Sequence, residues 1–317
     1  MGGACSTPGC KSWSQGIFPT IGADGTEVNG GVPQNGNLTA HLDQLNAQLP
    51  MWIPDPEWEG NAVFDFEAWT TVWAQNTNPD NWHGARYQQK SIALVKAANP
   101  AWPAAKVEAA AKEAFETAAT EWFVKSLEAG RKLRPKAKWG FYGLPENFLQ
   151  PCSGSGTDTK CSYDGPDAAT YRAESAGQAK VWAASTALYP SVYLSTGLEG
   201  KPDEAEAYLT AVVAEGVRCG TMAGGAPLPV YPYAWHYYHD GKEILPVSEV
   251  VATLEASAAA GASGVVMWGG SAVGRQNASA PYWQPVNFSQ NTFPDRARCV
   301  GTATARILIP AECSAVS

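Results

Sequence analysis

The sequence has little charge, few histidines and no long hydrophobic run. Charged residues are 16% of the 317 residues, and the net charge of -8 leaves no basic excess to neutralise the phosphates of a nucleic acid. No apolar run reaches the length of a membrane span. The opening residues Met1–Cys5 lack the basic start and the apolar stretch of a signal peptide. We therefore expect neither a nucleic acid nor a membrane span.

Motifs for several other chemistries are also missing. The four histidines form no convincing metal-binding cluster with Cys or carboxylates. His236-x-x-His239-Asp240 would need a helix to bind a metal, whereas it follows a predicted strand. The chain has no Gly-x-Ser-x-Gly elbow and no phosphate-binding glycine loop followed by Lys-Ser/Thr. We therefore expect no metal and no cofactor.

Cysteine and asparagine patterns indicate the compartment. Seven Cys accompany three Asn-x-Ser/Thr sequons, at Asn37, Asn277 and Asn287, which favours a secreted or lysosomal protein. Cys152 and Cys161 flank a Ser/Gly loop that a disulfide could close. The odd count leaves at least one thiol free or paired with another chain.

From residue 60 onward, predicted strands alternate with amphipathic helices. The longest helix is predicted from Ala104 to Arg134, because its apolar residues recur every three or four positions. Other helices are predicted at 167–187, 202–218 and 247–260, and strands at 138–142, 191–194, 229–234 and 264–268. This order predicts an α/β fold with parallel strands, either a TIM-like barrel or a doubly wound sheet. We expect residues 1–317 to form one catalytic domain and a monomer, with irregular segments at 1–28 and 270–317.

The most informative segment is Asn61–Trp69, an apolar strand that ends with Asp65 and Glu67. Alternation along a strand points both carboxylates the same way. Two neighbouring carboxylates in an aromatic setting do not both ionise readily, so one is expected to stay protonated near neutral pH. A protonated acid beside an ionised partner is the pair that glycoside hydrolysis uses. An isolated Asp-x-Glu at a strand end is more often a solvated edge, so the neighbouring residues decide.

Aromatic residues end several other predicted strands. Tyr142, Tyr193, Tyr233 and Trp268 each lie at or near such an end. In a barrel these ends meet at one mouth, where active sites lie, whereas a doubly wound sheet gathers only the strands beside its switch point. The pattern favours the barrel. The 13 Trp add to this argument, because an exposed indole can stack on a sugar ring, although core packing accounts for at least half of them.

Together these residues resemble the hyaluronidases, the family that cleaves β-1,4 bonds of hyaluronan and often of chondroitin. The resemblance covers roughly residues 16–270. Its blocks are Asn29-Gly30-Gly31-Val32-Pro33-Gln34, Phe64-Asp65-Phe66-Glu67-Ala68-Trp69, Trp139-Gly140-Phe141-Tyr142, Tyr189-Pro190-Ser191-Val192-Tyr193-Leu194, Pro232-Tyr233 and Gly264-Val265-Val266-Met267-Trp268.

The resemblance implies a TIM-like barrel and a retaining mechanism in which the substrate's N-acetyl oxygen is the nucleophile. It implies that Glu67 is the general acid and base and that Asp65 orients the acetamido group. Tyr142 and Tyr193 match positions that hold this group, and Trp268 matches the wall against which its methyl packs. Ser191 and Tyr233 lie in matching blocks and join the substrate-binding candidates. The implied partner is a glycosaminoglycan, either hyaluronan or chondroitin.

Two departures from the family keep other readings open. An Arg usually follows the Trp after Asp-x-Glu, whereas Trp69 is followed by Thr70 and Thr71. The family's first strand and helix also have no counterpart before Ser14, so the barrel is expected to lack its first βα unit. The alternatives are a secreted noncatalytic glycan-binding or adhesion protein, an inactive truncated homologue, and a hydrolase of another N-acetylhexosamine polymer.

Overall fold

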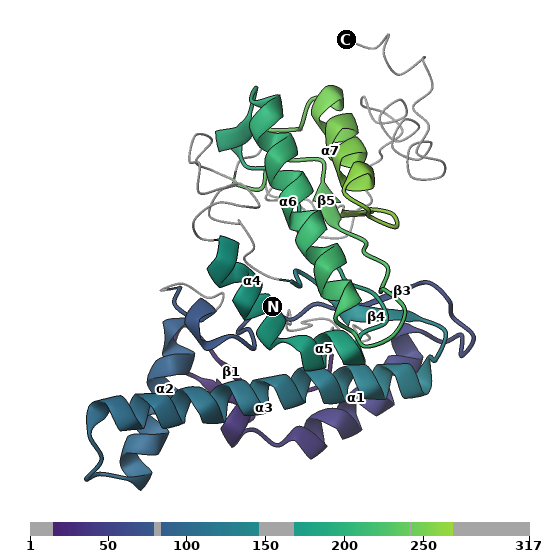
Figure 1. Ribbon diagram of the computed structural model, residues 1–317. Helices are drawn as coiled ribbons and strands as arrows, with labels where there is room; N and C mark the ends of the chain where they lie inside the picture. The colour runs from purple at the N-terminus through teal and green to yellow at the C-terminus, as the bar shows by residue number, and fades with distance from the viewer. Residues whose placement is uncertain (1–14, 79–83, 146–167, 241–242, 269–317) are drawn as a thin grey trace, which may run out of the picture. The chain divides into compact units, whose positions relative to one another are not determined.

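The computed structural model describes residues 15–78, 84–145, 168–240 and 243–268 (Figure 1). These residues fall into two units. Unit 1 comprises the described residues up to Phe141 together with Gly177–Thr186, and unit 2 comprises those of Tyr142–Ala176 and those from Ala187 onward. No helix in the described ranges combines the length and the apolar character that crossing a membrane requires.

Unit 1 contains most of the helices and one pair of parallel strands. Its elements are β1 (Thr20–Ile21), β2 (Glu27–Val28), η1 (Pro33–Asn35), α1 (Leu38–Trp52), β3 (Asn61–Phe64), η2 (Trp73–Gln75), α2 (Ala85–Ala98), α3 (Ala104–Leu133), β4 (Lys138–Phe141) and α5 (Ala179–Ala184). β3 and β4 pair in parallel, with Asn61 opposite Lys138 and Phe64 opposite Phe141. β1 and β2 form a short antiparallel pair within the N-terminal segment that the sequence predicts to be irregular.

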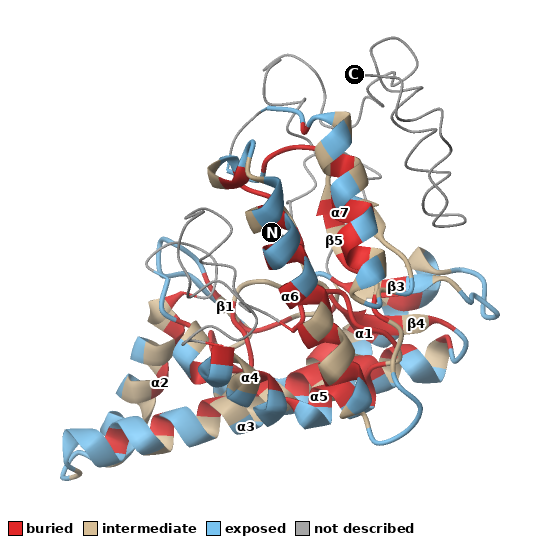
Figure 2. Ribbon diagram, turned by 45° about the horizontal axis from the view of Figure 1, so that its top comes forward, coloured by how far each residue is buried: buried red, intermediate tan, exposed pale blue. Residues whose placement is uncertain are grey.

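Helix α3 confirms the longest predicted helix to within one residue. Its buried residues recur at three- and four-residue steps and give the helix a buried stripe in Figure 2: Val107, Ala111, Phe115, Ala119, Trp122, Phe123, Ser126, Leu127 and Gly130. Arg134 follows the helix, and its Nε donates to the carbonyl oxygen of Ile53 at 2.7 Å. Pro135 comes next and cannot donate a helical hydrogen bond.

A buried histidine joins α1 to α3. The His41 side chain is fully buried, with Nδ1 3.0 Å from the backbone N of Ile17 and Nε2 2.9 Å from Ser126 Oγ. Because Nδ1 accepts the Ile17 N–H, the proton is on Nε2 and is donated to Ser126, which donates to the Trp122 carbonyl at 2.8 Å. Burial lowers the pKa of His41 to about 4. The imidazole is therefore neutral and structural.

Aromatic rings fill the core of unit 1. Phe123 of α3 stacks on Phe141 of β4 with centroids 4.1 Å apart, and Phe18 stacks on Phe66 at the same separation of 4.1 Å. The fully buried Trp69 packs edge-on against Phe66 at 4.8 Å. These contacts stabilise the segment that carries Asp65 and Glu67, because Phe66 and Trp69 belong to it.

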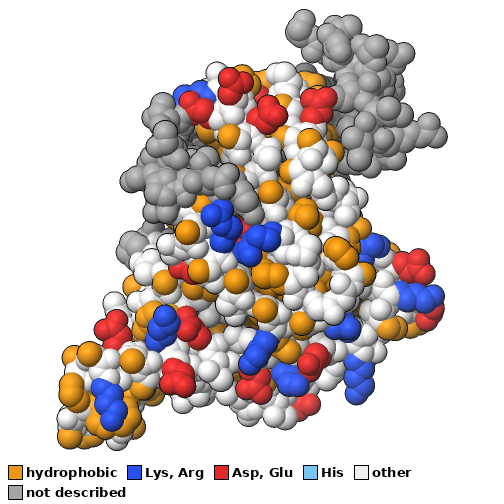
Figure 3. Space-filling view, in the orientation of Figure 1, with side chains coloured by type: hydrophobic (Ala, Val, Ile, Leu, Met, Phe, Trp, Pro, Cys, Tyr) orange, Lys and Arg blue, Asp and Glu red, His pale blue; other side chains and the backbone are white. Residues whose placement is uncertain are grey.

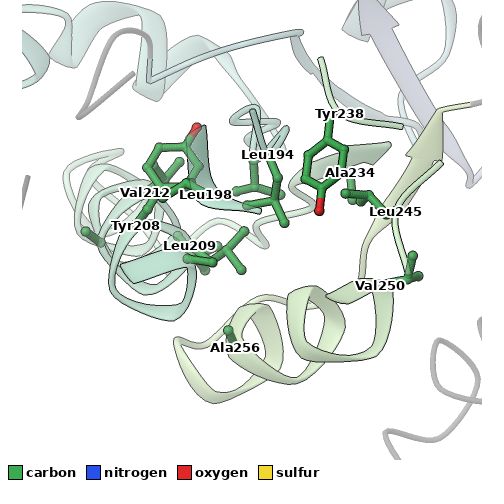
Figure 4. Packing of buried hydrophobic residues seen from close by; sticks show 14 of the residues in the cluster. Leu194, Leu198, Tyr208, Leu209, Val212, Ala234, Tyr238, Leu245, Val250 and Ala256 are labelled. Atoms are coloured by element: carbon green, nitrogen blue, oxygen red, sulfur yellow. The ribbon is translucent and has the colours of Figure 1, made fainter. Parts of the chain in front are cut away.

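Unit 2 contains α4 (Ala168–Gly177), η5 (Thr196–Leu198), α6 (Pro202–Thr221), β5 (Tyr233–Trp235), α7 (Val247–Ala259) and β6 (Val266–Trp268). β5 and β6 pair in parallel, with Tyr233 opposite Val266 and Trp235 opposite Trp268. Figure 4 shows its core, where side chains of α6 and α7 pack with those of the segments before α6 and between the two helices: Leu194, Leu198, Tyr208, Leu209, Val212, Ala234, Tyr238, Leu245, Val250 and Ala256.

Several predicted elements differ in detail. The strands expected at 138–142 and 264–268 are present as β4 and β6, whereas that at 191–194 is reduced to a single parallel bridge between Ser191 and Tyr233. The strand expected at 229–234 starts as an isolated bridge at Val230, and β5 extends to Trp235. The helices at 202–218 and 247–260 are present as α6 and α7.

The prediction of one continuous helix over residues 167–187 is wrong. α4 ends at Gly177 and α5 begins at Ala179, with Gln178 between them at φ -91° and ψ 16°. The Gln178 side-chain oxygen accepts the Thr71 hydroxyl at 2.7 Å. Glycine is a poor helix former, and this buried hydrogen bond to a distant residue is a tertiary contact that periodicity does not reveal.

The described strands form pairs and single bridges, and no closed sheet is present among them. The mixed helix and strand content and the parallel pairing agree with the α/β prediction. Charged side chains are interspersed over the face in Figure 3, where Lys and Arg lie among Asp and Glu. In the described part of that face the basic residues form no continuous tract.

Candidate active site

Asp65 and Glu67 lie directly after β3 rather than within it. β3 ends at Phe64, and the two carboxylates occupy the extended segment that follows. Asp65 is exposed, Glu67 is half-buried, and the ring of Phe66 between them packs into the unit 1 core. The backbone N–H of Asp65 donates to the Gln15 side-chain oxygen at 2.8 Å. An anchored residue thus separates two carboxylates that are accessible to different degrees.

The two residues after Trp69 are buried and hydrogen-bonded. Thr70 is 1% exposed, and its backbone N–H donates to Asn76 Oδ1 at 3.0 Å. Thr71 is 4% exposed and donates its hydroxyl to Gln178. Neither side chain supplies the positive charge of the Arg that the family usually has at the first of these positions.

In unit 2 the other candidate residues lie together. The Tyr142 ring is 5.0 Å from that of Tyr233 in an edge-to-face contact and 6.2 Å from that of Tyr193. The Tyr142 hydroxyl lies 3.4 Å from Ser191 Oγ. Tyr193 stacks on Trp268 with centroids 6.2 Å apart, and Trp268 is 41% exposed. The sequence thus selected five residues that the fold brings into one cluster.

Trp235 belongs to the same cluster and was missed by the sequence reasoning. Its ring lies 4.9 Å from Trp268 in an edge-to-face contact and 5.7 Å from Tyr193. The signal that could have found it is strand alternation, because Trp235 is two residues after Tyr233 and shares its face of β5. The other four aromatic residues of the cluster are half-buried or exposed: Tyr142, Tyr193, Tyr233 and Trp268.

The other reactive side chains considered among the described residues are two histidines and one cysteine. His236 and His239 follow β5 in a non-helical segment, as predicted, and no three metal-binding side chains gather anywhere among the described residues. Cys219 is free and buried, and burial together with the nearby Glu215 raises the pKa of its thiol. The predicted disulfide between Cys152 and Cys161 lies outside the described residues.

Comparison with known proteins identifies the family. The sequence profile of the hyaluronidase family, glycoside hydrolase family 56, matches residues 13–284. The chain belongs to this family. Human hyaluronidase-1 is 39% identical over 257 residues, which cover 80% of this chain and 56% of that protein. Rat hyaluronidase PH-20 is 33% identical over 84% of this chain and 50% of its own length. The chain thus spans about half the length of the relatives it matches.

Solved structures of the family are similar as well. Bee venom hyaluronidase matches with a TM-score of 0.70 and 31% identity over 80% of this chain and 76% of that one. The same enzyme in complex with a hyaluronic acid tetramer matches with a TM-score of 0.69 and 29% identity. The resemblance that the sequence motifs carry is therefore confirmed at the level of the family.

Proposed function

We propose that this chain is a glycoside hydrolase that cleaves the β-1,4 bonds of hyaluronan, and that it acts in a secreted or lysosomal setting. The observation that carries the proposal is family membership across residues 13–284 with Asp65 and Glu67 both present on an accessible segment. A bee venom relative of similar fold has been solved with a hyaluronic acid tetramer, which supports a glycosaminoglycan as the substrate class.

In the proposed mechanism the substrate supplies its own nucleophile. The carbonyl oxygen of its N-acetyl group attacks the anomeric carbon while the bond to the leaving oxygen breaks, and Glu67 donates its proton to that oxygen. Asp65 orients the acetamido group and stabilises the positive charge that develops on its nitrogen. Water then attacks the anomeric carbon and gives its proton to Glu67, while the bond from that carbon to the acetamido oxygen breaks. This step regenerates the N-acetyl group and restores the β configuration.

The aromatic cluster has the chemistry to bind the same sugar. Tyr142 and Tyr193 carry hydroxyls that can hydrogen-bond the acetamido group, and the exposed face of Trp268 can pack against its methyl. Ser191 and Tyr233 contact this group of residues and complete the proposed subsite. We also propose that the protein is a monomer.

We further propose that residues 1–317 form a single TIM-like barrel domain. The parallel pairs β3/β4 and β5/β6 support this proposal, as does the similarity to bee venom hyaluronidase. Because Phe64 and Phe141 are paired in parallel register, Asp65 follows the carboxyl end of that strand pair. Barrel active sites gather at this carboxyl end of the strands.

The test is turnover of a panel of polymers at mildly acidic pH, because the proposed mechanism uses the acid form of Glu67. We expect shortening of hyaluronan, and comparison with chondroitin shows how far Thr70 and Thr71 relax the preference for one polymer. Hyaluronan from which the N-acetyl groups have been removed should stay intact, because it lacks the nucleophile. Cleavage of that polymer would contradict the substrate-assisted mechanism. Binding of hyaluronan without any shortening would instead favour a noncatalytic glycan-binding protein.

A further inference from the structure

A short N-terminal segment of unit 1, Gln15–Pro19, contacts the carboxylate-bearing segment at three points. The Gln15 side-chain oxygen accepts the Asp65 N–H at 2.8 Å. The Phe18 ring stacks on Phe66 at 4.1 Å with an interplanar angle of 19°. The Pro19 carbonyl accepts the Trp69 indole N–H at 2.7 Å. One contact is therefore at Asp65, one lies between the two carboxylates, and one follows Glu67.

Residues Gln15–Pro19 are themselves fixed to the rest of unit 1. The N–H of Gly16 donates to Gln48 Oε1 at 3.2 Å, and that of Ile17 donates to His41 Nδ1 at 3.0 Å, both on α1. Asn29 Nδ2 donates to the Ile17 carbonyl at 2.7 Å. Gly16 has φ of +81°, and a Cβ there would lie 2.4 Å from His41 Nδ1. A side chain at this position would collide with His41, so glycine is required for this close approach of the segment to α1.

The three contacts constrain the carboxylates differently. Stacking of Phe18 on Phe66 holds the ring but tolerates sliding of one face over the other, because dispersion has no preferred direction in the plane. The indole of Trp69 fixes the segment after Glu67. The hydrogen bond from Asp65 is directional and acts at the residue that carries a reacting group. This hydrogen bond therefore fixes the position of the Asp65 backbone from which the carboxylate side chain extends.

We propose that Gln15 is a positioning residue that holds Asp65, and through it the Asp65–Glu67 pair, in the orientation that catalysis requires. This inference rests on the proposed function. Asp65 follows the last residue of β3 and is exposed, and among the described residues its backbone N–H is held by the Gln15 side chain. A displacement of about 1 Å in a catalytic group is enough to lower turnover by roughly 100-fold.

The variant that tests the proposal is Gln15→Met, which keeps the length of the side chain and removes the acceptor. We expect the Asp65 amide to exchange with deuterium about fivefold faster, in line with the loss of one solvent-accessible hydrogen bond. We expect kcat to fall roughly tenfold or more while KM stays within about twofold. The matched control is Gln48→Met, which removes an acceptor of Gly16 on the same segment without touching Asp65.

Gln15→Glu is the conservative variant that keeps the acceptor. The carboxylate can still accept the Asp65 N–H, so exchange should stay slow and most of kcat should be retained. A loss of kcat equal to that in Gln15→Met would show that the acceptor at this position is not what positions Asp65.

The outcomes keep this inference distinct from the proposed function. Unchanged Asp65 exchange and unchanged kcat in Gln15→Met would overturn the positioning role, as would equal losses of kcat in Gln15→Met and Gln48→Met. If the parent protein cleaves no polymer, the proposed function fails. In that case fast Asp65 exchange in Gln15→Met alone would still show that Gln15 holds the segment.

Discussion

Unit 1 and unit 2 each contain a cluster of aromatic rings, but the two clusters differ in exposure. In unit 1 the rings of Trp69, Phe123 and Phe141 are at most 2% exposed. In unit 2 Tyr142, Tyr193 and Trp235 are half-buried, and Trp268 is 41% exposed. The ring centroid separations overlap, because Trp69 and Phe123 lie 5.5 Å apart in unit 1, whereas Trp235 lies 4.9 Å from Trp268 and 5.7 Å from Tyr193 in unit 2. Contact geometry alone therefore does not separate them.

The difference shows two uses of one residue class. Rings that are closed off from water on every side contribute stability and fix the backbone near Asp65 and Glu67. Rings that pack on one side and meet solvent on the other have a face left for a ligand, and a sugar ring has a matching apolar face. Aromatic content alone does not show which use applies, whereas burial does.

The largest effect on stability is expected for Phe123→Ala in unit 1. This substitution removes a buried ring that stacks on Phe141, so it should lower the free energy of unfolding by about 3–5 kcal/mol. Chemical denaturation followed by tryptophan fluorescence measures the loss. A change below about 1 kcal/mol would contradict the assignment of this cluster to the core.

A smaller effect comes from His41, which hydrogen-bonds the Ile17 backbone and the Ser126 hydroxyl. Its pKa is about 4 in the folded chain and about 6.5 when unfolded, so the unfolded state binds more protons between these values. Stability should therefore fall as pH drops from about 7 to 4.5, by roughly 2–3 kcal/mol from this group. Urea midpoints at both pH values measure the slope. His41→Gln, which cannot titrate, should reduce it, and an unchanged slope would refute the prediction.

The smallest effect on stability is expected in unit 2. Trp268→Ala should leave folding nearly intact and weaken binding of hyaluronan oligosaccharides by about 1 kcal/mol, roughly fivefold in Kd. The matched control is Trp58→Ala in unit 1, because Trp58 is 42% exposed and Trp268 is 41% exposed. Equal losses of affinity in both variants would erase the distinction between the two regions.

The sequence predicted what depends on local periodicity. The buried residues of α3 repeat regularly at helical spacing, and the predicted ends of this helix agree with the observed ends to within one residue. The five aromatic and serine candidates of unit 2 could be found because strand ends and family motifs coincide at Tyr142, Tyr193 and Trp268.

The features that sequence reasoning missed depend on contacts between distant residues. The interruption at Gln178 comes with a hydrogen bond to Thr71, 107 positions away in the chain. Gln15 meets Asp65 across 50 positions, and no local pattern marks it. Trp235 was within reach of strand alternation, but β5 was predicted to end one residue before it.

The most direct test of the central claim compares Glu67→Gln with the parent protein on hyaluronan at mildly acidic pH. The amide keeps the shape of the side chain but has no acidic proton to donate, so turnover should fall by about 100-fold to 10,000-fold while the Kd for a hyaluronan oligosaccharide changes less than about threefold. Loss of turnover with retained binding would place the chemistry at Glu67 and the binding elsewhere in the site. Full activity of Glu67→Gln would remove Glu67 from the mechanism and contradict the account.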